Sequence, residues 1–158
     1  TGATSSRSTH EGETRVRVLF DTNVVLDLLL AREPHLEPAI RLFSLVDRGA
    51  IAGVLCATTL TTIHYIASRT VGPEDVARHL SELLEMFEVA AVDASVLRDA
   101  IALPFADFED AVLHEAARHA GAQAIVTRNL KDFSEAELPV FEPHELLAAL
   151  DAAAGGQG

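Results

Sequence analysis

Three separate segments of the chain carry acidic or amide side chains that could bind a metal ion. Asp21 follows an apolar run, and Asp107 and Asp110 stand at the start of a helical pattern. Asn129 and Asp132 follow a second apolar run. Carboxylate and amide oxygens suit Mg²⁺ and Mn²⁺, and clustered carboxylates need protons or cations to offset their repulsion. A cation held there could activate a water and stabilise the departing 3′ oxygen of a phosphodiester, so the residues indicate metal-assisted hydrolysis.

Each of these residues also has a structural interpretation. Asp21 could cap the helix that follows it, and Asp107 could cap another helix while Asp110 complements that helix's dipole. Asn129 and Asp132 could be turn residues. A cap needs only one acid per helix, however, and several acids gathered at one edge of a sheet exceed that need. Taken together, the segments favour a metal site.

The elements that must position these residues follow from the hydrophobic pattern. Short apolar and β-branched runs, which predict strands, alternate with amphipathic stretches that predict helices. This alternation indicates an α/β fold with a mostly parallel five-stranded sheet and helices on both faces, in which residues after the strands meet in one crevice. We expect strands over 16–20, 51–56, 87–92, 124–127 and 139–141. We expect helices over 23–31, 58–69, 74–86, 94–103, 107–119 and 142–150, and a further helix that Pro34 and Pro38 delimit at its start and that reaches residue 46.

The composition limits the class of protein. The chain has 158 residues, 24 Asp and Glu against 12 Lys and Arg, and a net charge of −12, which repels nucleic acid unless a metal or basic partner intervenes. The acidity could also serve solubility alone. The lone Cys56 lies in an apolar run, which predicts a buried thiol.

The ends of the chain differ in composition from its body. We expect a disordered polar arm over 1–15, one domain over 16–150 and a flexible tail over 151–158. The arm has no apolar segment typical of a secretory signal, and no apolar run is long enough to cross a membrane. We therefore expect a cytoplasmic protein that does not bind membranes.

Four segments, kept in order along the chain, resemble the PIN domain family. They are LFDTNV at 19–24, DFEDA at 107–111, IVTRNLKDF at 125–133 and PHELL at 143–147. The branch to which they are most similar is the VapC-like toxins of bacterial type II toxin-antitoxin pairs. The resemblance implies a five-stranded parallel sheet, Mg²⁺- or Mn²⁺-dependent cleavage of RNA, and a cognate antitoxin that blocks the cleft.

The resemblance also assigns catalytic and metal-binding positions. Asp21 matches the first metal-binding acid and Asp110 the acid on the central helix, while Asn129 stands where many members have a fourth acid. Asp132 could supply the charge that Asn129 lacks, and Asp107, with Glu109, is near enough in sequence to join the cluster. Thr62 aligns with a position that usually carries Glu, and its hydroxyl cannot replace that charge.

Polar and basic residues near the acids are candidates for substrate binding. Asn23 and Thr127 match residues that orient the first carboxylate and line the strand ends, and Arg128 and Lys131 could hold RNA phosphates. Solvated surface charge explains Lys131 about as well, and it explains Arg32 and Arg69 better, so those two arginines are weaker candidates. The histidines, among them His64, His114 and His119, have no metal-ligand spacing and are interpreted as surface or packing residues.

Two other functions remain open. Because Thr62 and Asn129 replace acids, the chain could be an eroded PIN domain that only binds RNA or a protein. The Asp21-Thr22-Asn23 element is also similar to the nucleophile loop of some phosphatases, but Asn23 stands where their general acid would be. As partners we expect RNA, a basic antitoxin that lays Arg or Lys among the acids, and a second copy of the chain.

Overall fold

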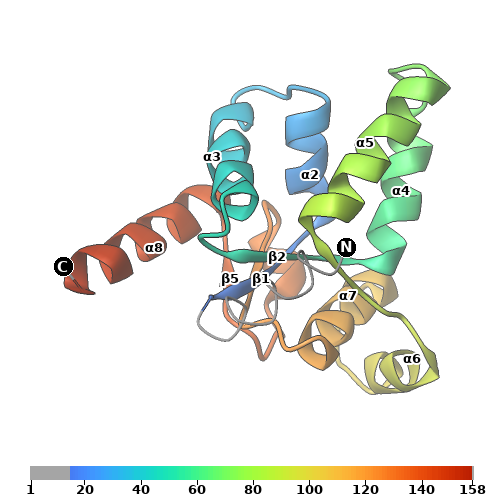
Figure 1. The fold of residues 1–158 in the computed structure, drawn as a ribbon. Coiled ribbons are helices and arrows are strands. Elements are labelled where there is room, and N and C mark those ends of the chain that lie inside the picture. Colours follow the sequence, from blue (N-terminus) through green and yellow to red (C-terminus); the bar gives the residue numbers. More distant parts are fainter. Residues whose placement is uncertain (1–14, 158) are drawn as a thin grey trace, which may run out of the picture.

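A computed structural model describes residues 15–157 of the chain. Five parallel strands form one sheet in the order β3-β2-β1-β4-β5, which confirms the expected α/β fold (Figure 1). The strands are β1 (Arg17–Phe20), β2 (Ala52–Cys56), β3 (Glu88–Ala90), β4 (Ala124–Val126) and β5 (Val140–Phe141).

Helices cover both faces of the sheet (Figure 1). The helices are α2 (Thr22–Leu29), α3 (Leu36–Asp47), α4 (Ala57–Ala67), α5 (Pro73–Met86), α6 (Ala94–Ile101), α7 (Phe108–His119) and α8 (Pro143–Gln157), and a 3₁₀ turn, η1 (Leu130–Phe133), follows β4. None of the helices in the described part of the chain is long and apolar enough to span a membrane.

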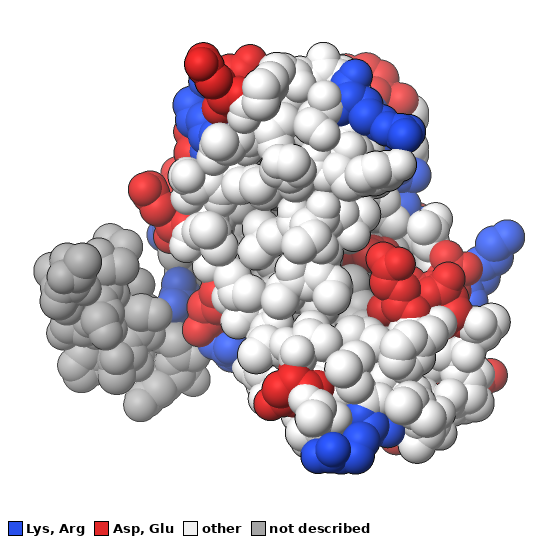
Figure 2. Space-filling model, turned by 90° about the vertical axis from the view of Figure 1, so that its right-hand side faces the viewer, with Lys and Arg blue, Asp and Glu red and all other residues white. Residues whose placement is uncertain are grey.

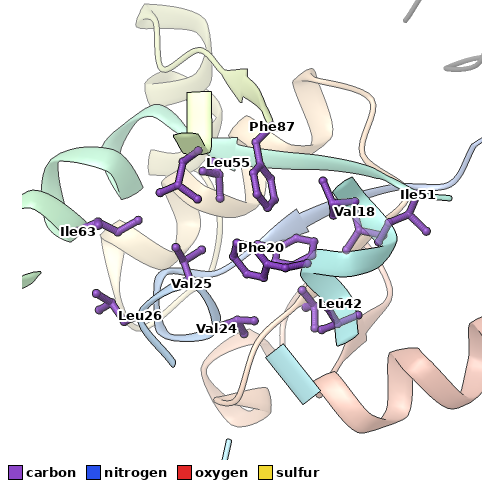
Figure 3. Packing of buried hydrophobic residues seen from close by; sticks show 14 of the residues in the cluster. Val18, Phe20, Val24, Val25, Leu26, Leu42, Ile51, Leu55, Ile63 and Phe87 are labelled. Atoms are coloured by element: carbon purple, nitrogen blue, oxygen red, sulfur yellow. The ribbon is translucent and has the colours of Figure 1, made fainter. Parts of the chain in front are cut away.

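Alternation along the strands divides the core between the two faces. Val18 and Phe20 point to one cluster and Leu19 to the other, as the two-residue period of a strand requires. Residues of α2 to α5 and α8 pack in the first cluster, where the rings of Phe20, Phe43 and Phe87 meet edge to face (Figure 3). Residues of α6 and α7 pack in the second.

Three expectations about the elements need correction. The strand expected over 87–92 is only Glu88–Ala90. The helix α3 includes Pro38, which its first turn tolerates because the amides there have no partner within the helix. Residues 151–157, expected as a tail, continue α8, since their alanines favour helix. The arm expected over 1–15 lies, apart from Arg15, outside the described residues.

Candidate metal and nuclease site

Asp21 is fixed at the carboxyl end of the central strand. Phe20 pairs in register with Val126, so Asp21 and Thr127 leave their strands side by side. Thr127 Oγ1 donates to Asp21 Oδ2 over 2.7 Å, and Asn23 Nδ2 donates to the same oxygen over 3.3 Å. The Thr22 amide donates to Oδ1 over 2.7 Å, so Asp21 does cap α2. Its second oxygen, however, is held by side chains from two elements.

Burial and neighbouring charge both act on the Asp21 carboxyl. The residue is 8% exposed. Burial raises its pKa, the hydrogen bonds from Thr127, Thr22 and Asn23 lower it, and the charge of Asp132 raises it again, with a raised pKa as the result. The carboxyl of Asp132, on η1, is therefore close enough to Asp21 to repel it.

Asp110 lies in the first turn of α7, where the charges of the other acids in the cluster act on its carboxyl. Burial raises the pKa of its carboxyl to about 7, together with the charges of Asp107, Asp21, Asp132 and Glu109. Asp107 itself caps α7, since its Oδ1 accepts from the Asp110 amide over 3.2 Å. The structural interpretation of Asp107 is thus correct, and its charge still contributes to the cluster.

The carboxylates of this cluster lack a compensating cation from the part of the chain that the structure describes. Within residues 15–157, no Lys, Arg or His side chain forms an ion pair with Asp21, Asp110 or Asp132. Figure 2 shows carboxyl side chains gathered beside a hollow on the face that α4, α5, α6 and α7 present. Oxygen ligands with uncompensated negative charge fit a divalent cation such as Mg²⁺ or Mn²⁺.

The predicted polar neighbours lie where the sequence places them. Thr127 and Asn23 orient Asp21, and the backbone amide of Asn129 donates to Thr127 Oγ1 over 3.0 Å. Asn129 is exposed beside them. The amide of Arg128 donates to Asn23 Oδ1 over 3.3 Å, so Asn23 joins α2 to the segment after β4.

Arg128 has an internal partner that the sequence analysis missed. Its Nε and Nη2 donate to the two oxygens of Asp27 over 2.6 and 3.1 Å, and Asp27 is 1% exposed. Two of the five N–H groups of the guanidinium are therefore used by Asp27, and the phosphate-binding role that the sequence suggests for Arg128 stays a prediction. Lys131 is exposed on η1. The signal for the pair was Asp27 itself, an acid inside an apolar helical run, which needs a buried partner.

The threonines of α4 occupy the region where the acid is missing. Thr59 is buried and accepts from Thr22 Oγ1 over 3.3 Å, so α4 contacts the segment that follows Asp21. Thr62, one turn later, is half-buried and donates to the Thr58 carbonyl over 3.2 Å. Its hydroxyl is thus used within the helix and adds no charge.

A second cluster with metal-ligand residue types is already neutralised. Asp99, Glu115 and His119 bring one ligand atom each within 4.8 Å of the others. Arg118 Nη2 lies 3.2 Å from Asp99, 2.9 Å from Glu115 and 3.5 Å from His119. Although burial raises the Glu115 pKa, hydrogen bonds from Arg118 and His114 lower it overall. The guanidinium of Arg118 thus lies among the three side chains, where a metal ion would have to bind.

His114 packs inside the molecule, which is one of the two interpretations, surface or packing, that the sequence left open. It is fully buried, and its Nε2 accepts from the amides of Glu137 and Leu138 over 3.1 and 3.3 Å. The proton must then lie on Nδ1, which donates to Glu115 Oε2 over 2.8 Å. His64 and His119 are exposed.

A cavity elsewhere in the fold has a different character. It measures about 510 Å³ and lies between α3 and α8, with Ala50 and Ile51 at its end. Those residues precede β2, so the cavity is at the amino edge of the sheet, whereas the acids follow the carboxyl ends. It has no part in the candidate site.

Solved structures of toxin-antitoxin proteins share this fold. VapBC2 from Rickettsia felis, bound to a DNA fragment from its promoter, matches with a TM-score of 0.63 and 16% identity over 79% of this chain and 97% of that chain. A toxin-antitoxin complex from Klebsiella pneumoniae matches with a TM-score of 0.63 and 22% identity over 81% and 98%. Mycobacterium tuberculosis VapC20, a toxin that cleaves the sarcin-ricin loop, matches with a TM-score of 0.56 and 17% identity over 68% and 86%.

Sequence comparison identifies the family. No curated protein matches the chain. The model of the PIN domain matches residues 17–131, which include β1 to β4 and, among the acids of the candidate site, Asp21, Asp107 and Asp110, while Asp132 directly follows the matched range. Nucleases are found in this family, and this chain belongs to the PIN domain family.

Proposed function

We propose that this protein is a divalent-metal-dependent endoribonuclease and the toxin of a toxin-antitoxin pair. The observation that carries the proposal is the group of uncompensated carboxylates around Asp21 and Asp110 at the carboxyl edge of the sheet. The similar folds of VapBC2 and VapC20 support the same function. Asp21, Asp110 and Asp132 would hold Mg²⁺ or Mn²⁺, with Asp107 adding charge from the helix cap.

Several residues of the chain would have separate roles in the hydrolysis of RNA. A bound divalent ion supplies an activated water and offsets the charge of the scissile phosphate. Thr127 and Asn23 keep Asp21 in one orientation, so little reorganisation is needed when a ligand binds. The side-chain amide of Asn129 can donate hydrogen bonds to phosphate oxygens, which a carboxylate could not do. The exposed side chain of Lys131 can contact the RNA backbone.

Replacing Asp21 by Asn tests this proposal. The D21N variant should lose cleavage of RNA in Mn²⁺ by at least about a hundredfold and remain folded, because it removes one of several repelling charges. D93N is the matched control, since Asp93 caps α6 away from the acids and Asn caps equally well. Full activity of D21N would refute the assignment.

The eroded PIN domain is the second candidate. The neutral residues at 62 and 129 favour it, because Thr62 donates to a backbone carbonyl and Asn129 has no charge. A binding-only protein should retain RNA in a filter-binding assay but give no cleavage in Mn²⁺ that D21N abolishes. The same assay therefore decides between the two functions.

We also propose a basic antitoxin and self-association as partners. The carboxylates offer a site where an antitoxin could place an Arg or Lys. A broad surface without charged side chains adjoins them in Figure 2, where two copies of a chain of net charge −12 could meet with less repulsion than at a charged surface. Ile101 on α6 is 71% exposed. If the chain self-associates through exposed apolar side chains such as Ile101, I101D should halve the mass measured by light scattering.

A further inference from the structure

The ion pair of Asp27 and Arg128 joins two elements that carry the candidate site. Asp27 lies in α2, which follows Asp21 directly, and Arg128 lies between Thr127 and Asn129 in the segment that leads to η1 and Asp132. The pair is bidentate, with 2.6 and 3.1 Å between the donors and the two carboxylate oxygens. Arg32 Nη1 lies 4.0 Å from the same carboxylate.

The location of the charge is unusual for α2. The helix buries Val24, Val25 and Leu26 on its inner side, yet Asp27 beside them is 1% exposed and ionisable. A buried carboxylate is costly unless it is paired and hydrogen-bonded. The pair with Arg128 supplies both, so moving the 127–133 segment away from α2 would leave Asp27 with only the more distant Arg32, at 4.0 Å, and without its bidentate hydrogen bonds.

The same segment is fastened to α2 at two further points. Asn23 Oδ1 accepts from the Arg128 amide over 3.3 Å, and Asn23 Nδ2 lies 3.5 Å from Thr127 Oγ1. These contacts are weaker than the bidentate ion pair of Asp27 and Arg128. The pair therefore contributes the strongest link between the helix that follows Asp21 and the segment that carries Thr127, Asn129 and Asp132.

We infer that Asp27 and Arg128 are positioning residues, which hold the 127–133 segment so that Asp132 and Asn129 stay beside Asp21 and Asp110. This inference rests on the proposed function for its catalytic consequence, but not for its structural part. This role differs from the expected binding of RNA phosphate by Arg128, because one edge of the guanidinium, Nε and Nη2, is used by Asp27. Neither residue would touch substrate or metal.

The first test needs neither metal nor substrate. In the metal-free protein, hydrogen exchange of the amides of 127–133 should be at least tenfold faster in D27N and in R128Q than in the wild type. D75N is the control, because Asp75 also pairs with an arginine, Arg78, but on the exposed surface of α5. It should leave exchange at 127–133 unchanged, and unchanged exchange in folded D27N would overturn the inference.

The second test measures Mn²⁺ affinity by calorimetry and kinetics with RNA. D27N, R128Q and the double variant should each weaken Mn²⁺ about tenfold, with the double no worse than either single, because both substitutions remove one shared link. The value of kcat should fall with little change in KM. If R128Q raises KM alone while D27N behaves as the wild type, Arg128 is a phosphate ligand and the inference is wrong.

The conservative variant R128K guards against a failure to fold. Lysine keeps the charge that Asp27 needs but lacks the two-pronged geometry, so R128K should fold and show effects smaller than those of R128Q. Wild-type exchange and Mn²⁺ affinity in both R128K and R128Q would overturn the inference. A wild type that binds no Mn²⁺ would refute the proposed function instead, while the exchange test would still decide the positioning role.

Discussion

At the scale of single residues, the Asp110 carboxyl links stability to pH. Its pKa of about 7 lies above the ordinary value of 3.8, so the folded protein keeps a proton that the unfolded chain releases. Stability of the metal-free protein should therefore fall as pH rises from about 4 to about 7. D110N should abolish this part of the dependence and gain about 1 to 2 kcal/mol at pH 8, a figure reduced because the carboxyl is partly exposed.

Urea denaturation in EDTA at pH 5.5 and pH 8 measures this difference. D93N is again the control, and it should follow the wild type at both values. The same proton must leave before a cation binds, so Mn²⁺ affinity should rise through about pH 7. Equal pH dependence of the unfolding free energy in D110N and wild type would contradict the role given to Asp110.

Thr62 tests whether the missing acid limits metal binding. T62E should tighten Mn²⁺ binding several-fold, because it adds a carboxylate to the helix that contacts the segment after Asp21. T61E, on the exposed neighbour, is the matched control and should change affinity little. Calorimetry measures both. Unchanged or weaker binding in T62E would mean that Asp107 and Asp132 already supply the charge.

At the scale of elements, much of the fold could be predicted from the sequence. Apolar runs with β-branched residues placed all five strands, and the abrupt change from Phe20 to Asp21 placed the edge where the acids gather. Asp107 and Asp110 were correctly placed at the start of a helix. These features are local, because they depend on periodicity and on capping preferences.

The contacts that could not be predicted join residues far apart in the chain. The pair of Asp27 with Arg128 spans 101 positions, and the amides of Glu137 and Leu138 bind His114 across 23 and 24 positions. Periodicity indicates that Asp27 and His114 are on buried faces, but it does not identify which side chain or amide lies opposite. Such partners depend on the packing of whole elements.

His114 illustrates how one helix holds the connection between η1 and β5. H114L should destabilise the protein by about 1 to 3 kcal/mol, because the amides of Glu137 and Leu138 lose their acceptor. H64L, at an exposed position of α4, is the control and should have little effect. Urea denaturation gives the values. If H114L is as stable as H64L, the two amides must find other acceptors.

At the scale of the whole molecule, the charge decides how partners approach. A net charge of −12 gives little long-range attraction to RNA, so under the proposed function the binding of substrate would depend on a metal ion and on local contacts such as Lys131. The same charge would attract the proposed antitoxin through a basic arm, which could place an Arg or Lys among Asp21, Asp110 and Asp132. The acidic surface would then favour the binding of the antitoxin over the binding of RNA.

The association rate with such an antitoxin should therefore fall steeply with salt. Between about 50 and 500 mM NaCl we expect at least a tenfold decrease in stopped-flow measurements, because screening shortens the reach of surface charge. Neutralising the basic arm should remove both the salt dependence and most of the inhibition. A rate independent of salt, with full inhibition by the neutralised arm, would mean that the antitoxin docks through apolar surfaces and that the acidity serves solubility alone.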